Sequence, residues 1–157
     1  NKYLKEFVKK KIIKTNGNNR KDMSYHITES GLAYLNQLFS LFMNETLMLH
    51  RETKEEYMSR LQRFYNDGIR RVVFYGSADM AQISFNAAEE IGFEIVGIVD
   101  GDPSKHGKFF AGRRIDPPSA IEDIQPDAVL IASFANREKI YHGISYLEKK
   151  GIRIISL

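Results

Sequence analysis

The chain has 157 residues, of which 43% are hydrophobic and 27% are charged, a balance typical of a folded globular protein and unlike that of a disordered one. It contains no cysteine, which excludes disulfide bridges and thiolate metal sites, and no apolar run approaches the roughly 18 residues that a membrane span requires. Together with the lack of a signal-peptide pattern, these features predict a cytoplasmic protein that does not interact with membranes.

The net charge of +3 is unevenly distributed, because residues 1–30 are rich in Lys and Arg and poor in acidic residues. Such a concentration of positive charge is typical of a segment that binds a polyanion, above all nucleic acid. It is equally compatible with an ordinary solvated surface. Charge alone does not decide between the two.

The first third of the chain predicts a helix, a hairpin and a second, long helix. Apolar residues at helical spacing predict the last turns of a helix over 3–8, and the lack of a cap before it indicates that the sequence is a fragment. Two β-branched runs, 11–15 and 23–28, flank a polar loop with an Asn-Gly pair and predict a β-hairpin. Thr28-Glu29-Ser30-Gly31 then has the form of a helix cap.

The long helix predicted after this cap ends at the stop signal Asn66-Asp67-Gly68. Its apolar residues recur at near-helical spacing and form a broad apolar stripe along the helix. This is more apolar surface than a linker needs. We therefore expect Leu38, Phe42 and Leu49 to be buried between two subunits of a homodimer.

From residue 70 onward, strands and helices alternate. Continuous apolar strands separated by amphipathic helices predict a parallel sheet covered on both faces, and hence a Rossmann-like α/β fold. The strands are expected over 71–75, 94–99, 128–132 and 153–157, with a short extended piece around 113–115, and the helices over 78–91, 118–124 and 137–149.

The turn after the first of these strands occupies the place of a phosphate-binding loop. In the fingerprint G-x-G-x-x-G/A, Gly76 fits the first position and Ala81 the third, but Ala78 stands at the second, where a methyl group opposes close approach of a pyrophosphate. Asp79 in the first helical turn suits the helix dipole and repels a phosphate nearby. A purely structural turn is the alternative.

Asp100 closes the second strand, where a ribose-binding carboxylate is expected. The alternative is that Asp100 and Asp102 simply cap the loop that follows. Ligands of open α/β sheets bind beyond the carboxyl ends of strands, so position alone makes Ser133 and Phe134 candidates as well. The ligand-binding residues predicted at this edge of the sheet are Gly76, Ser77, Ala78, Met80, Asp100, Asp102, Lys105, Ser133 and Phe134.

Catalytic and metal-binding patterns are not found in the sequence. The four histidines are scattered without metal-ligand spacing, and neither G-x-S-x-G nor H-E-x-x-H occurs. Tyr141 and Lys139 do not form the Tyr-x-x-x-Lys pair of a short-chain dehydrogenase. We therefore predict no catalytic residues, no metal site and no enzyme activity.

Residues 3–36 resemble the recognition-helix end, wing and exit helix of MarR-type winged-helix regulators. The resemblance rests on the charged hairpin and on the pattern hydrophobic-Thr-x-x-Gly-x-x-x-Leu from Ile27 to Leu35. It implies that a recognition helix with Lys2 and Lys5 contacts the major groove of duplex DNA. A wing tip would contact the backbone through Asn18, Asn19, Arg20 and Lys21.

Residues 71–157 resemble the Rossmann-like domains at the start of polysaccharide-biosynthesis nucleotide-sugar dehydratases and of sugar acetyltransferases. The motifs that carry the resemblance lie at 73–78, 96–107 and 127–133, and the Asp-x-Asp-Pro-x-Lys-x-Gly loop from Asp100 is the most specific. The resemblance implies a nucleotide or nucleotide-sugar ligand, with NAD(H) as another possibility. Rex-type redox-sensing repressors share the combination of a winged helix with a Rossmann domain.

Together these patterns predict three parts: a partial winged-helix domain (1–35), a helical linker and dimerisation segment (36–69), and a Rossmann-like domain (70–157). The leading functional hypothesis is a dimeric, DNA-binding transcriptional regulator that senses a nucleotide-type ligand, with surface-polysaccharide metabolism as the setting that the resemblance suggests. A nucleotide-sugar-metabolising enzyme or enzyme domain is the first alternative. A dimerisation scaffold that binds no ligand is the second.

Overall fold

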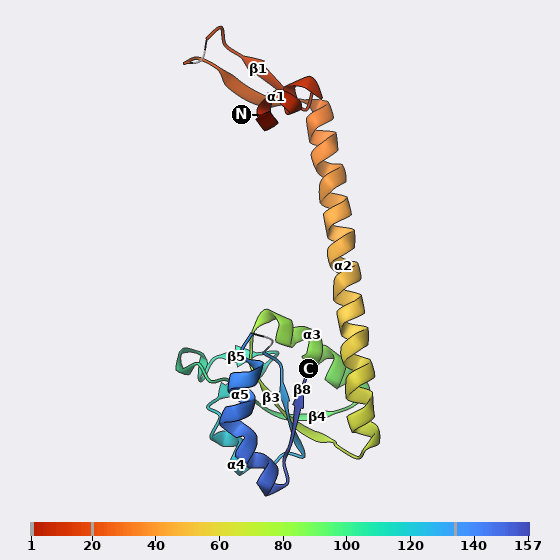
Figure 1. Ribbon diagram of the computed structural model, residues 1–157, viewed down its shortest axis with the longest axis vertical. Coiled ribbons are helices and arrows are strands. Elements are labelled where there is room, and N and C mark those ends of the chain that lie inside the picture. The colour runs from red at the N-terminus through yellow and green to blue at the C-terminus, as the bar shows by residue number, and fades with distance from the viewer. Residues whose placement is uncertain (1, 20, 134) are drawn as a thin grey trace. The chain divides into compact units, whose positions relative to one another are not determined.

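The computed structural model describes residues 2–19, 21–133 and 135–157 and is shown in Figure 1. By its internal contacts the chain divides into two compact units, Asn1–Leu49 and His50–Leu157. The division falls within helix α2 (Glu29–Asn66). The predicted three-part division at 35 and 69 stays a prediction.

The first unit consists of a helix, a hairpin and the first half of α2, in the order expected from the sequence. Helix α1 (Lys2–Lys9) precedes strands β1 (Ile13–Asn16) and β2 (Ser24–Ile27), which pair in antiparallel register from Ile13 opposite Ile27 to Asn16 opposite Ser24.

The junction between the hairpin and α2 explains the Thr-x-x-Gly pattern in local terms. The Thr28 hydroxyl donates a hydrogen bond to the Lys11 carbonyl (2.5 Å) and accepts one from the Gly31 N–H (2.9 Å). A Cβ atom at Gly31 would lie 1.9 Å from the Ile12 carbonyl oxygen, a distance that no side chain tolerates. Thr28 and Gly31 are therefore required for the hairpin to pack against the start of the helix.

The two halves of α2 differ in their surroundings. Before residue 50 its large apolar side chains are exposed, with Phe42 at 63% and Leu38 at 44%, whereas Leu61 in the second unit is fully buried. Within the described residues no helix is long and apolar enough to cross a membrane.

The second unit is built on a six-stranded sheet with the strand order β5-β6-β4-β3-β7-β8. All neighbouring strands are parallel except β5, which pairs antiparallel with β6. The central strand β3 is flanked by the second and third parallel strands on one side and the fourth and fifth on the other, which is the order of a Rossmann half. The strands are β3 (Arg71–Tyr75), β4 (Glu94–Val99), β5 (Phe109–Phe110), β6 (Arg113–Asp116), β7 (Ala128–Ile131) and β8 (Arg153–Ser156).

Helices cover both faces of this sheet, and Figure 1 shows strands of the sheet between α3 and α5. The expected helix over 137–149 is an α-helix followed by a 3₁₀-helix, in which the last turns are more tightly wound. The helical segments are α3 (Asp79–Ile91), η1 (Pro103–Lys105), α4 (Ala120–Ile124), α5 (Arg137–Ile144) and η2 (Ser145–Lys150).

The core consists of two clusters, one on each face of the sheet, because successive side chains of a strand point to opposite faces. Val72 and Phe74 of β3 belong to the cluster that includes Leu61 of α2 and Phe85 of α3. Val73 and Tyr75 belong to the other cluster, which is formed with residues of α4, α5 and η2. The predicted α/β fold with a largely parallel sheet, covered on both faces, is therefore confirmed.

Candidate functional site

A cleft of about 760 Å³ lies in the second unit at the carboxyl ends of the central strands. This is where open parallel sheets bind their ligands. Seven of the predicted ligand-binding residues line it: Gly76, Ser77, Ala78, Asp100, Asp102, Lys105 and Ser133. Of the other two, Phe134 lies outside the described residues, and Met80 is in α3 but its side chain is not among those described.

Gly76 makes the turn from β3 into the cleft. Its φ of +111° is a backbone conformation that L side chains rarely adopt, and its N–H donates to the Val99 carbonyl of the neighbouring strand at 2.8 Å. A Cβ atom at this position would lie 3.3 Å from Cβ of Ser133. The glycine therefore allows two strand ends to approach each other closely at the rim of the cleft.

Replacing Gly76 with alanine is expected to lower the free energy of unfolding by about 1–3 kcal/mol, since it combines backbone strain with this close contact. Gly112→Ala is the matched control, because Gly112 also has a positive φ but has open space around it. Urea denaturation compares the two variants. Equal losses of stability would mean that the contact with Ser133 contributes nothing.

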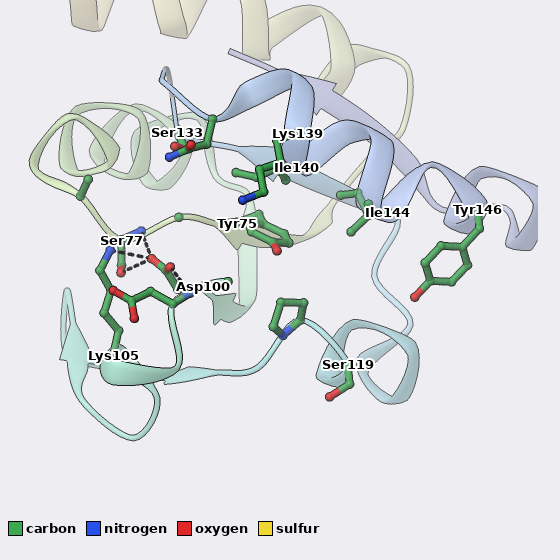
Figure 2. Close-up of a pocket in the computed structure, with 17 residues that line it drawn as sticks. Tyr75, Ser77, Asp100, Lys105, Ser119, Ser133, Lys139, Ile140, Ile144 and Tyr146 are labelled. Atoms are coloured by element: carbon green, nitrogen blue, oxygen red, sulfur yellow. Dashed lines mark hydrogen bonds and ion pairs between the residues drawn. The ribbon is translucent and has the colours of Figure 1, made fainter.

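Asp100 connects the two loops that form the polar rim of the cleft. Its Oδ2 atom accepts hydrogen bonds from the Ser77 N–H (3.1 Å), the Ser77 hydroxyl (2.7 Å) and the Lys105 ammonium group (2.8 Å), as Figure 2 shows. Its Oδ1 atom accepts from the Asp102 N–H at 2.9 Å. This carboxylate is 8% exposed as a residue and has a partner on each oxygen.

Burial raises the pKa of the Asp100 carboxyl, but hydrogen bonds from Lys105, the Asp102 N–H and Ser77, with the charge of Lys105, lower it by more. The net result is a pKa below the ordinary value, so that Asp100 is ionised at neutral pH. The Asp102 carboxylate accepts from the Ser104 N–H at 2.9 Å and caps η1. Asp102 therefore has the loop-capping role considered as an alternative from the sequence.

Helix α5 forms a wall of the cleft that sequence reasoning missed. The lining positions on and before this helix recur at intervals of three and four residues, so they share one helical face; these are Asn136, Lys139, Ile140, Gly143 and Ile144. That periodicity was the available signal. Other lining residues missed from the sequence are Tyr75, Gly101, Pro118, Ser119 and Tyr146.

The residues predicted to bind DNA lie in the first unit, away in sequence from this cleft. Lys2, Lys5, Asn18 and Lys21 are exposed, and Arg20 lies outside the described residues. The Asn19 side chain serves the hairpin loop itself, because its Oδ1 accepts from the Lys21 N–H at 2.9 Å and its Nδ2 donates to Asp22 at 2.7 Å. Asn19 therefore has a structural explanation that needs no DNA.

The strand order defines the second unit as a Rossmann-like domain. A family model described as the C-methyltransferase C-terminal domain matches residues 37–157. This match covers most of the chain. The chain therefore belongs to the C-methyltransferase C-terminal domain family.

The chain is also similar to the crystal structure of UDP-D-quinovosamine 4-dehydrogenase from Vibrio fischeri, with 21% sequence identity and a TM-score of 0.45. The similarity covers 57% of this chain and 78% of that one. Among curated proteins, no sequence matches the chain.

The family corrects the leading functional hypothesis from the sequence. The interpretation as a MarR-type or Rex-like transcriptional regulator with duplex DNA as its partner is wrong, and so is the expectation that the chain is no part of an enzyme. The homodimer was predicted from the apolar stripe of the long helix, independently of DNA, and no finding tests it. The Thr-x-x-Gly pattern that suggested a winged-helix domain has a local explanation, because Thr28 and Gly31 allow the hairpin to pack on the helix. The alternative of an enzyme domain is the better one.

Proposed function

We propose that the chain is the acceptor-binding domain of a C-methyltransferase, and that its cleft holds an acceptor substrate with a phosphate group. A methyltransferase of this kind binds two substrates, a methyl donor and a molecule whose carbon receives the methyl group. The cleft is lined by two carboxylates, Asp100 and Asp102, and by two lysines, Lys105 and Lys139, so which of these charges are already paired bears on which of the two substrates enters it.

The observation that carries the proposal is Lys139, a cation on the cleft wall that has no acidic partner among the described residues. Lys105, the other lysine of the lining, is paired with Asp100 at 2.8 Å, so its charge is already balanced. Lys139 is exposed in the cleft and is free to contact an anion. Phosphate is an anion that lysine commonly binds.

Two helices also begin at the cleft without a side-chain cap. The capping positions of α3 and α5 are Ala78 and Asn136, neither of which makes a side-chain hydrogen bond to its helix, and both line the cleft. The first N–H groups of a helix need hydrogen-bond acceptors and favour negative charge. The first turns of these helices also carry Asp79 and Glu138, and acidic residues there oppose a second anion, so the proposal depends on Lys139.

A nucleotide-sugar is the form of acceptor that this proposal favours, in agreement with the ligand predicted from the sequence. The residues expected to contact it include Gly76, Ser77 and Ala78 at the turn and Ser133 opposite them. Met80 and Phe134 remain predicted contacts. NAD(H) is disfavoured, because the methyl group of Ala78 stands where a dinucleotide pyrophosphate needs bare backbone.

The test is calorimetric titration of the chain with UDP-glucose, dTDP-glucose, glucose and S-adenosylmethionine. We expect micromolar binding of at least one nucleotide-sugar and none of glucose, which has no phosphate. We expect Lys139→Gln to weaken that binding about five- to tenfold, as the loss of a charge-assisted hydrogen bond predicts. S-adenosylmethionine is expected not to bind, because it carries no phosphate group.

Lys149→Gln is the matched control, because Lys149 is an exposed lysine outside the lining of the cleft. It removes the same charge and is expected to leave the dissociation constant unchanged. If both variants weakened binding equally, Lys139 would act only through the net charge of the chain and not through contact with the ligand. Binding of S-adenosylmethionine would assign the cleft to the methyl donor instead.

A further inference from the structure

The cleft has two chemically different halves, and Figure 2 shows them on opposite sides of Tyr75. One half holds the Ser77, Asp100 and Lys105 cluster. The other contains Ser119, Ile144 and Tyr146, and with Pro118 and Ile140 it presents mainly apolar groups. A ligand that fills both halves therefore has a charged end and an apolar end.

Gly143 leaves space in the apolar half. It lies on the cleft-facing side of α5, between Ile140 and Ile144, and a Cβ atom there would meet no atom within 4 Å. Its backbone is ordinary helix, so no left-handed conformation requires a glycine here. The absence of a side chain has one local effect, which is to keep this part of the cleft open.

The Tyr75 hydroxyl is a polar group that faces this space without a protein partner. Tyr75 is only 9% exposed and lines the cleft, yet no described residue forms a hydrogen bond with its hydroxyl. Burial, and then the negative charge of Asp100, raise the pKa of the phenol, so it stays protonated and can donate. Among the described residues no buried side-chain oxygen lacks a hydrogen-bond partner, so this unpaired hydroxyl is accessible from the cleft, where a ligand or water can accept its hydrogen bond.

Tyr146 offers its ring rather than its hydroxyl. The hydroxyl donates to Glu122 at 2.8 Å, and Lys150 forms an ion pair with the same carboxylate at 2.5 Å. These contacts hold the side chain in place at the wall of the cleft. The Lys150 ammonium nitrogen lies over one face of the ring, 5.6 Å from its centroid, so the opposite face is the one available to a ligand.

We propose that the apolar half of the cleft is a slot for the planar base of a nucleotide, with Tyr75 as the hydrogen-bonding group at its floor. The inference rests on the proposed function, since it places the base of the same phosphate-bearing acceptor. A base has apolar faces and a polar edge, which match the walls of Ile140 and Ile144 and the Tyr75 hydroxyl. A sugar ring carries hydroxyl groups all round, and these walls would leave most of them without partners.

This placement assigns different ends of the ligand to different residues. The base lies between α5 and Pro118, and the phosphates lie toward Lys139 and the turn at Gly76. Asp100 is not expected to bind the ribose, which was one of the two roles that the sequence left open for it. Three donors already converge on Asp100 Oδ2. Asp100 thus organises the rim instead of accepting from a ligand.

The experiment fills the slot with a side chain and measures binding of UDP, dTDP, ADP and inorganic pyrophosphate to the chain. We expect Gly143→Phe to weaken the tightest nucleoside diphosphate at least about tenfold and to leave the affinity for pyrophosphate unchanged. Tyr75→Phe, which removes only the hydroxyl, is expected to weaken the same nucleotide about three- to tenfold, again without effect on pyrophosphate. Lys139→Gln is expected to weaken both probes.

His142→Phe is the matched control, because His142 is exposed on α5 and does not line the cleft. Thermal unfolding checks that Gly143→Phe folds, and Gly143→Leu, with a strong helix former, provides a second variant. If a nucleotide binds and the Gly143 variants leave its affinity unchanged, the base slot is wrong while the proposed function stands. If neither pyrophosphate nor any nucleotide binds the wild-type chain, the proposed function is wrong, and the base slot with it.

Discussion

Replacing Phe74 with alanine is expected to lower the free energy of unfolding by about 3–5 kcal/mol, the range found when a buried aromatic side chain is removed from a close-packed core. Phe74 is fully buried on the central strand β3. Its ring lies 5.4 Å from that of Phe85 on α3, so the substitution leaves a cavity between sheet and helix. Urea denaturation followed by circular dichroism measures the loss.

Phe109→Ala provides the control for this prediction. Phe109 lies on the edge strand β5 and is 74% exposed, so its removal is expected to change stability by less than about 0.5 kcal/mol. A small effect of Phe74→Ala, comparable to that of Phe109→Ala, would contradict the assignment of Phe74 to the core.

Replacing Asp100 with asparagine is expected to lower the free energy of unfolding by about 1–3 kcal/mol at neutral pH, because Lys105 and Ser77 lose a charged acceptor in a mostly buried position. The pKa of Asp100 is lowered in the folded chain. Its stabilising contribution is therefore fully present above the pKa of the unfolded chain and is lost as the pH falls through the folded value. The difference between wild type and Asp100→Asn is expected to be constant above about pH 5 and to narrow below about pH 4.

Denaturation curves at a series of pH values test this, with Glu94→Gln as the control for an exposed carboxylate. A stability difference that stays constant down to pH 3 would show that the Asp100 carboxylate is not preferentially ionised in the folded chain.

The fold of the second unit was predictable because its strands are buried on both faces. Runs such as Val72 to Phe74 and Ala128 to Ile131 are continuously apolar, and only a parallel sheet between helices buries both sides of a strand. The strands were expected close to where they lie. The end of the helix after Arg137 was not, since the change from α- to 3₁₀-helix at Ser145 leaves the periodicity of apolar residues nearly unaltered.

Half of the candidate site was predictable from sequence. Gly76, Asp100 and Ser133 follow directly after strands, and the carboxyl ends of parallel strands meet at one edge. Much of the rest comes from α5, whose Ile140 and Gly143 are ordinary helix residues in the sequence. That this helical face meets the cleft depends on how the helix packs on the sheet, which local patterns do not specify.

In the first unit, residues that have a structural role were assigned a function from their sequence pattern. The charged hairpin and the Thr28 to Gly31 pattern were attributed to DNA recognition, although Asn19 of the hairpin and the Thr28 to Gly31 pattern have structural explanations in the folded chain. Gly31 allows the Ile12 carbonyl to approach the helix, and Asn19 holds the hairpin loop together. A sequence motif that is required by local packing can occur in proteins of different function, so it does not by itself indicate DNA binding.

The hydrogen bonds to Asp100 also affect the thermodynamics of ligand entry. Ser77 follows β3 and Lys105 follows β4, and one carboxylate holds both before any ligand arrives. Ordering a loop during binding costs conformational entropy and weakens affinity. In this chain the two loops lose that entropy when the chain folds. A ligand of the proposed kind would therefore bind a rim that is already ordered, and its affinity would not be reduced by the cost of ordering the loops.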